Sequence, residues 1–206
     1  RGPLRAFVYP QFRILWVASL CSIVSFFMVM ISRAWLILDL TDSPFLVTAI
    51  QAVSMLPMLV LPPFGGVIAD RLDRRTILIT SEIANLLILL ILVLLLFTQL
   101  IQVWHVFFLA FMSGVTFALA MPARAAAVPD VVEDERGIAN GVALWGSIFS
   151  YATLIGPALA GYLLSIDPNQ LGWGFLGAAF ILIPSVSFLL LLRLPQNTKP
   201  EGEPFE

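Results

Sequence analysis

Six apolar stretches, each about as long as a bilayer core is thick, constrain the fold of this chain more than any other feature. A helix needs about 20 apolar residues to cross a hydrocarbon core of roughly 30 Å. Lipid offers no water to backbone amides, and the stretches lack the alternation of a membrane barrel, so all six must be helical. They run approximately over 14–38, 46–69, 77–97, 103–121, 138–164 and 172–192. The sequence therefore predicts an all-α membrane protein with six transmembrane helices.

The composition agrees with this prediction. Hydrophobic residues make up 60% of the 206 positions, against roughly 45–50% in soluble domains. The net charge is only −2, and the few charges are segregated, so no nucleic-acid surface is expected. The single cysteine, Cys21, lies inside the first stretch, which leaves no metal cluster or disulfide framework to predict. We expect neither a metal nor a cofactor.

The basic residues predict the orientation. Ten of the eleven Lys and Arg residues fall before the first stretch, between the second and third, between the fourth and fifth, or after the sixth. These connections share one side of the membrane, and such bias marks the cytoplasmic side. The chain is thus expected to be a multi-pass protein of the plasma (inner) membrane with both termini in the cytoplasm. Its expected organisation is a cytoplasmic N-terminus over 1–13, a six-helix bundle over 14–194 and a cytoplasmic tail or inter-domain linker over 195–206.

The longest connection on the cytoplasmic side, residues 122–136, is expected to contain a short interfacial helix. Pro129 suits the first turn of such a helix. Acidic residues follow it at 130, 133 and 134, where they would face the positive end of the helix dipole. Polar turns before the second and fifth stretches also hint at an inverted repeat of three helices plus three.

A charged segment, Gly66-Val-Ile-Ala-Asp70-Arg71-Leu72-Asp73-Arg74-Arg75, joins the second and third stretches. Asp70 falls where a helix is expected to end, and unpaired carbonyls make that position unfavourable for a carboxylate. It therefore needs a cationic partner or the N-terminus of another helix. Asp73 is expected to cap the third helix. An ordinary positive-inside loop would account for the same charges.

This segment resembles the signature between helices two and three of the major facilitator superfamily. Gly66, the Asp70-Arg71 pair and the basic pair Arg74-Arg75 match in spacing and side. Asp73 departs from the pattern, because the family commonly has glycine there. The resemblance implies that Asp70 engages a helix end in the opposite half of a transporter and influences conformational switching, with Arg71, Arg74 and Arg75 in support. The family fold has twelve spans, and this chain resembles its N-terminal six.

Two further segments are similar to the drug and siderophore exporter branch of that superfamily, the enterobactin-exporter-like proteins. One is Pro122-Ala-Arg124-Ala-Ala-Ala-Val-Pro129-Asp-Val-Val, followed by Ala139-Asn140-Gly141. The other is Gly156-Pro157-Ala158-Leu159-Ala160-Gly161, which resembles the antiporter motif of helix five. Helix packing by small residues is an alternative explanation of the second segment. Arg124 also suits the inner end of a helix without any functional role.

Arg33 is a charged residue inside the first stretch, where a charge is costly and usually faces a cavity or a partner. The alternative is that the long Arg33 side chain extends to the interface between membrane and water. In the family that the chain resembles, helices one and four line the central path. This resemblance makes Arg33, Ser113 and Thr116 candidates for binding substrate or protons.

Taken together, these features predict a secondary active exporter of a small amphiphilic molecule, working by alternating access and coupled to protons. Its expected partners are the bilayer, its substrate, and a C-terminal six-helix half or a second copy. The chain lacks an initiator methionine, so a half-transporter fragment is the alternative. An intramembrane serine protease is disfavoured, since His105 and Ser113 lie about 12 Å apart along one helix. No phosphate-binding loop surrounds the sole lysine, Lys199, so we expect no ATP-driven transport.

Overall fold

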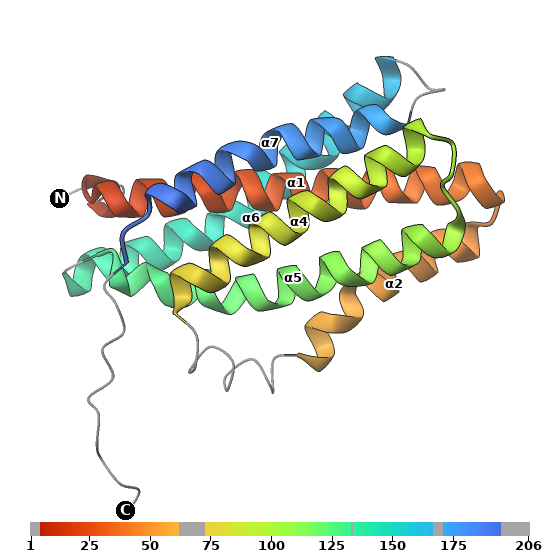
Figure 1. Ribbon diagram of the computed structural model, residues 1–206. Coiled ribbons are helices and arrows are strands. Elements are labelled where there is room, and N and C mark those ends of the chain that lie inside the picture. Colours follow the sequence, from red (N-terminus) through yellow and green to blue (C-terminus); the bar gives the residue numbers. More distant parts are fainter. Residues whose placement is uncertain (1–4, 62–72, 133, 167–170, 195–206) are drawn as a thin grey trace, which may run out of the picture.

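The computed structural model describes residues 5–61, 73–132, 134–166 and 171–194, and every regular element in these ranges is helical. Figure 1 shows long helices running roughly alongside one another, with the 3₁₀ turn and the last turn of the final helix at the same end of the bundle. The elements are η1 (Arg5–Val8), α1 (Pro10–Thr41), α2 (Pro44–Val60), α4 (Arg74–Phe97), α5 (Val103–Asp130), α6 (Glu135–Ile166) and α7 (Gly172–Leu191).

The six predicted spans correspond to these helices in order. Five of them, all except α2, are long and apolar enough to cross a membrane. The described part of α2 has 17 residues, and the rest of the predicted second span, 62–69, lies outside the described residues. Asp73 caps α4 as expected, because its carboxylate accepts a hydrogen bond from the Thr76 amide at 3.3 Å. The all-α fold of six helices in order, which the resemblance implies, is therefore confirmed.

The connection 122–136 differs from its prediction. No separate interfacial helix begins at Pro129, because α5 continues without interruption from Val103 through Pro122 and Pro129 to Asp130. A helix can tolerate internal proline where neighbouring groups satisfy the freed carbonyls. The next helix instead starts at Glu135, just after Asp134 accepts a hydrogen bond from the Gly137 amide at 3.1 Å. Pro129 thus sits at the end of a helix and not at the start of one.

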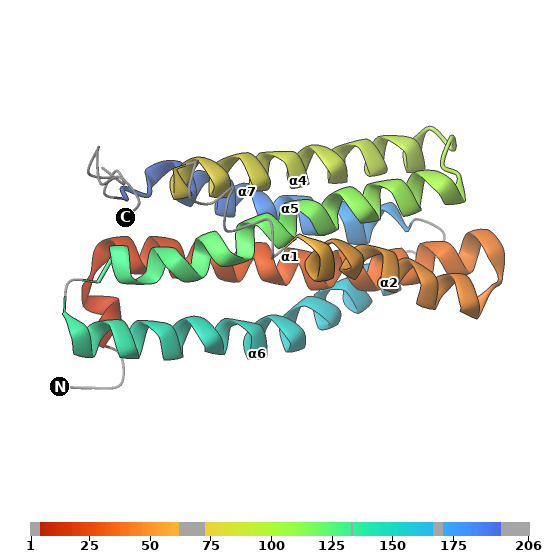
Figure 2. The ribbon, with the colours of Figure 1, turned by 90° about the horizontal axis from the view of Figure 1, so that it is seen from below.

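The packing follows the predicted repeat of three helices plus three. Exchanging α1, α2 and α4 for α5, α6 and α7 maps the α1–α7 contact onto α5–α4, and the α1–α6 contact onto α5–α2. The α1–α2 contact maps onto α5–α6 in the same way. Because α1 and α5 run in opposite directions (Figures 1 and 2), the repeat is inverted.

Helix α1 occupies the middle of the bundle, packed against α2, α5, α6 and α7. Figure 2 shows α6 on one side of α1, with α4 and α7 on the other. Buried serines fasten α1 to α7, since Ser25 donates to the Ala178 carbonyl and Ser185 donates to the Ala18 carbonyl, each at 2.9 Å. These bonds satisfy hydroxyl groups that would otherwise be unpaired in the interior.

The contact between α1 and α6 depends on Gly156, part of the predicted helix-five motif. A Cβ atom at this position would lie 2.6 Å from the Phe27 Cβ and 2.9 Å from the Val24 carbonyl oxygen. Neither neighbour can move aside easily, because one is a backbone atom and the other is fixed to it. The absent side chain is therefore what lets the two helices approach so closely.

Replacing Gly156 with leucine should push α6 away from α1 and lower stability by about 1–3 kcal/mol, the usual cost of overpacking. Thermal unfolding of the purified protein in detergent would measure the change. Gly146→Leu, on the same helix, is the matched control, because a Cβ there meets nothing within 4 Å. Equal stability of the two variants would contradict the proposed close contact.

Candidate functional site

Three helices bring a buried pair of opposite charges together. Glu82 lies two turns into α4, Arg124 lies in the last third of α5, and Ser22 lies in the first half of α1. The Glu82 and Arg124 side chains are each only 2% exposed. Their three helices belong to both repeats, since α1 and α4 come from the first and α5 from the second. The pair therefore joins the two halves of the bundle.

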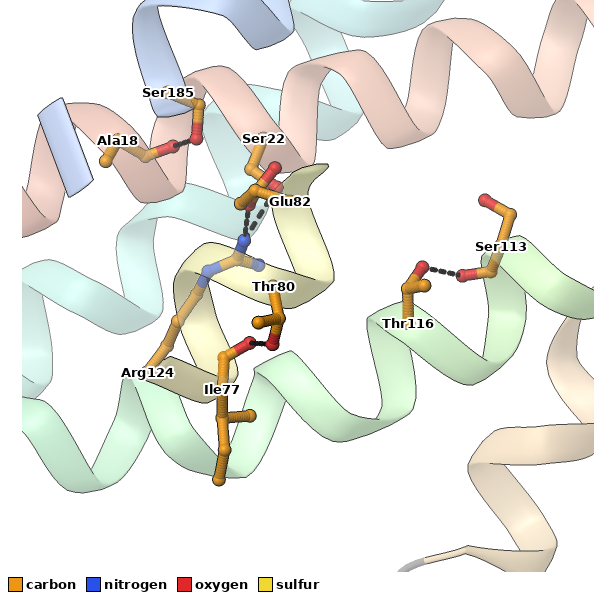
Figure 3. A network of polar contacts seen from close by, with 9 residues as sticks. All are labelled: Ala18, Ser22, Ile77, Thr80, Glu82, Ser113, Thr116, Arg124 and Ser185. Atoms are coloured by element: carbon orange, nitrogen blue, oxygen red, sulfur yellow. Dashed lines mark hydrogen bonds and ion pairs between the residues drawn. The ribbon is translucent and has the colours of Figure 1, made fainter. Parts of the chain in front are cut away.

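The geometry of the pair leaves part of each group unpaired. Arg124 Nη2 donates both to Glu82 Oε1 and to Ser22 Oγ, the latter at 2.8 Å (Figure 3). Glu82 Oε2 and Arg124 Nη1 are buried and have no hydrogen-bond partner among the described residues. Removing one charge from such a pair leaves the other uncompensated in a low-dielectric interior, which typically costs about 3–5 kcal/mol.

A cavity of about 10 Å³ adjoins the pair. It has room for about one water molecule and is far too small for a drug-sized ligand. Its lining residues come from α1, α4 and α5: Ser22, Ser81, Glu82, Asn85, Thr116, Phe117, Ala120 and Arg124. A site of this size and polarity can hold a single water molecule but not a drug-sized ligand.

Two of the candidate lining residues lie close to this cavity. Thr116 lines it directly, with its hydroxyl donating to the Ser113 carbonyl at 2.8 Å. Ser113 is buried, and its hydroxyl donates to Asn85 Oδ1 at 2.9 Å. Because Asn85 also lines the cavity, the polar group extends from the ion pair to the middle of α5.

Arg33, the third candidate, does not join this group. It is 3% exposed, and its Nε and Nη2 atoms have no hydrogen-bond partner among the described residues. It lies eleven residues beyond Ser22 on α1, about 16 Å along the axis. The structure therefore separates Arg33 from the ion pair, and a role in binding remains a prediction.

The charged segment between α2 and α4 is described only in part. Gly66, Asp70 and Arg71 lie outside the described residues. Arg74 pairs with Asp130 and donates to the Ala126 carbonyl at 3.0 Å, which ties the start of α4 to the end of α5. Arg75 donates to the Leu190 carbonyl of α7 at 2.8 Å. Both arginines therefore bind the ends of neighbouring helices. These contacts lie at the end of the bundle that also contains η1.

The two glycines of the helix-five motif have different surroundings. Gly156 packs against α1, whereas a Cβ at Gly161 would meet nothing within 4 Å. Pro157 lies inside α6 next to the close contact. One glycine of the motif therefore packs closely inside the described bundle, and the other faces open space.

Asp134 fastens the N-terminal segment to the start of α6. Its carboxylate accepts a hydrogen bond from the Tyr9 hydroxyl at 2.8 Å and pairs with Arg5 at 2.8 Å. The Tyr9 hydrogen bond, with help from the Gly137 amide and Arg5, lowers the pKa of this carboxyl below its ordinary value. Because the folded pKa is the lower one, this contact stabilises the fold above the ordinary pKa and is lost as the pH falls through the lowered value.

Glu82 is the site residue that sequence reasoning missed. The signal that could have found it is that an acid two turns inside a membrane-length apolar helix needs a partner. Arg124 was assigned to a helix end because α5 was expected to stop at Met121, and its true position is inside the helix.

Comparison with known proteins identifies the family. The sequence profile of the family described as transmembrane secretion effectors, a branch of the major facilitator superfamily, matches residues 1–201. The chain belongs to this family. The resemblance of the sequence to this exporter branch of the superfamily is therefore confirmed.

Two curated relatives match this chain over part of their length. The uncharacterized MFS-type transporter YfiS of Bacillus subtilis is 28% identical over 166 residues, which cover 77% of this chain and 38% of the relative. Macrolide efflux protein A of Streptococcus pyogenes is 24% identical over 156 residues, which cover 76% of this chain and 38% of the relative. The chain thus aligns with well under half the length of these curated relatives.

A double-mutant cycle tests whether the buried pair acts as a unit. Glu82→Leu and Arg124→Leu should each destabilise the protein by about 3–5 kcal/mol, because each leaves a charge unpaired. The double variant should be more stable than the sum of the two losses implies. Thermal unfolding in detergent provides the measurement.

The partly exposed Arg74–Asp130 pair is the control for this cycle, and its single variants should lose at most about 1 kcal/mol. Simple additivity of Glu82→Leu and Arg124→Leu would show that the two side chains do not depend on each other.

Proposed function

We propose that this chain is the N-terminal six-helix half of a secondary active exporter that moves a small amphiphilic molecule by alternating access, coupled to protons. It lies in the cell membrane with both termini in the cytoplasm. The orientation rests on the basic residues, since all described ones except the buried Arg33 and Arg124 lie at the end of the bundle where η1 lies. The observation that carries the coupling is the buried Glu82–Arg124 pair.

Glu82 has the properties that a proton-carrying group needs. It is an ionisable carboxylate buried in a membrane-spanning helix, and such groups mark proton relays in transporters. Its Oε2 atom is unpaired among the described residues and lies beside a cavity that could admit a single water. The charged group in contact with it is Arg124 of α5.

Protonation of Glu82 would change the balance of charge between the repeats. With Glu82 ionised, its charge offsets that of Arg124 and holds α4 against α5. With Glu82 neutral, Arg124 keeps its bond to Ser22 of α1 but loses its counter-ion. A buried cation without a counter-ion is unfavourable, so the protonated state favours a rearrangement of α1, α4 and α5. This is a physical route from proton binding to helix movement.

The proposed cargo follows from the apolar interior and from a relative. Few charges line the bundle, which suits a molecule with a large apolar surface. The name of one relative, macrolide efflux protein A, describes an exporter of an organic compound. We infer a small amphiphilic substrate for this chain and assign no particular compound.

The chain is proposed to work with a second six-helix unit. Alternating access needs one bundle to rock against another, and these residues match 38% of the length of the relatives. The second unit would be a C-terminal half, or else a second copy of this chain. The alternative function is a half-transporter that is inactive without that partner.

Inverted membrane vesicles that contain the protein provide the test. A proton gradient with an acidic interior should drive uptake of a fluorescent amphiphile, and a protonophore should abolish it. Glu82→Gln should lose the gradient-driven uptake, because an amide cannot bind the coupling proton, yet keep the slower flux down a substrate gradient.

Glu135→Gln is the matched control, since it makes the same change at an exposed carboxylate at the start of α6 and should transport normally. Uptake that survives the protonophore would exclude proton coupling. Full gradient-driven uptake by Glu82→Gln would show instead that another group carries the proton.

A further inference from the structure

A second cavity, much larger than the one beside the ion pair, lies away from the pair. It has a volume of about 510 Å³ and sits where α1 and α6 end and α7 begins. This is the end of the bundle opposite η1 and the last turn of α7 (Figure 1). Along α1, Trp35 in its wall is thirteen residues beyond Ser22, or about 20 Å. The described lining residues are Trp35, Leu38, Asp39, Asp42, Gly161, Leu164, Ser165 and Leu171.

The size and the apolar walls suit an organic molecule. Ligand pockets for drug-sized compounds span about 300–1,000 Å³ and are mostly apolar with a few polar groups. Three leucines and one tryptophan supply the apolar surface here. Trp35 is 55% exposed as a residue, so a ligand can reach its side chain.

The two carboxylates that line the cavity favour a ligand with a positive charge. Asp39 and Asp42 both line the cavity, and no ion pair to either carboxylate occurs within the described part of the chain. Asp42 is held in place as the cap of α1, its amide donating to the Leu38 carbonyl at 2.8 Å. An exposed tryptophan face beside two carboxylates attracts an organic cation by both ring and charge.

Gly161 keeps part of this cavity open. A Cβ at Gly161 would meet nothing within 4 Å among the described residues, so contacts inside this bundle do not require a glycine at this position. Gly161 lines the cavity, and the absence of a side chain there leaves space for a ligand.

We propose that this cavity binds an amphiphilic organic cation, with its positive group near Asp39 and Asp42 and its apolar body against Trp35 and the leucines. Binding itself does not depend on transport. The further step, that the bound cation is cargo at the outer end of the export path, rests on the proposed function.

Binding is tested with two probes of matched shape and opposite charge. Equilibrium dialysis of the purified protein in detergent would measure the affinity for tetraphenylphosphonium, a cation, and for tetraphenylborate, an anion. We expect the cation to bind more tightly by about tenfold or more. Equal affinity for the two ions, or tighter binding of the borate, would overturn the assignment.

Two sets of variants locate the site. Gly161→Leu should fill the cavity and weaken tetraphenylphosphonium binding by about tenfold or more. Gly146→Leu is the matched control, because it adds the same side chain to open space elsewhere on α6 and should bind as the unaltered protein does. Asp39→Asn with Asp42→Asn should lower affinity for the cation and leave affinity for the borate unchanged or raised.

Unchanged cation affinity in Gly161→Leu, with thermal unfolding like that of Gly146→Leu, would overturn the site. If Gly161→Leu fails to fold, the exposed Trp35→Ala replaces it, and unchanged affinity in that variant has the same meaning. The vesicle assay measures transport independently of the binding experiment. Cation binding without gradient-driven export would reject the proposed function alone, whereas export without binding at this cavity would reject the site alone.

Discussion

The contact on which the bundle most depends is the buried pair formed by Glu82 and Arg124. A charge inside a membrane-spanning helix is costly unless it is compensated, and each of these residues compensates the other. Ser22 adds a third helix to the contact. Because α1 and α4 come from one repeat and α5 from the other, the pair fixes how the two repeats meet. Any movement of one repeat against the other has to preserve this contact or neutralise one of its members.

The inverted repeat gives the bundle two equivalent close crossings. At one of them, Gly156 of α6 lets that helix approach α1. At the other, a Cβ on Gly114 of α5 would lie 2.1 Å from the Ser54 carbonyl oxygen of α2. The exchange that relates α1 to α5 and α6 to α2 maps one crossing onto the other. Without a hydrophobic force between helices in lipid, small residues at both crossings supply the close packing that holds α2 and α6 to the central helices.

The sequence was sufficient for the architecture but not for the site. Membrane-length apolar stretches locate the helices to within a few residues, because lipid permits little else. The predicted end of α5 was wrong because proline usually breaks a helix. Here the helix passes through both Pro122 and Pro129. Glu82 and Arg124 are 42 residues apart in the chain. No local pattern connects them, and only the antiparallel packing of α4 against α5 makes them partners.

An aromatic contact lies between the buried ion pair and the larger cavity. Phe26 of α1 stacks on Phe117 of α5 with ring centroids 4.1 Å apart. This stack lies one turn beyond Ser22, so it closes the α1–α5 interface on the side of the ion pair that faces the larger cavity. Both rings are largely buried, and parting them would expose apolar surface and lose a stacking interaction of about 0.5–1.5 kcal/mol. The stack therefore opposes separation of α1 from α5 at this level. Under the proposed coupling, a shift of α1 relative to α5 has to offset this cost before the interface can part.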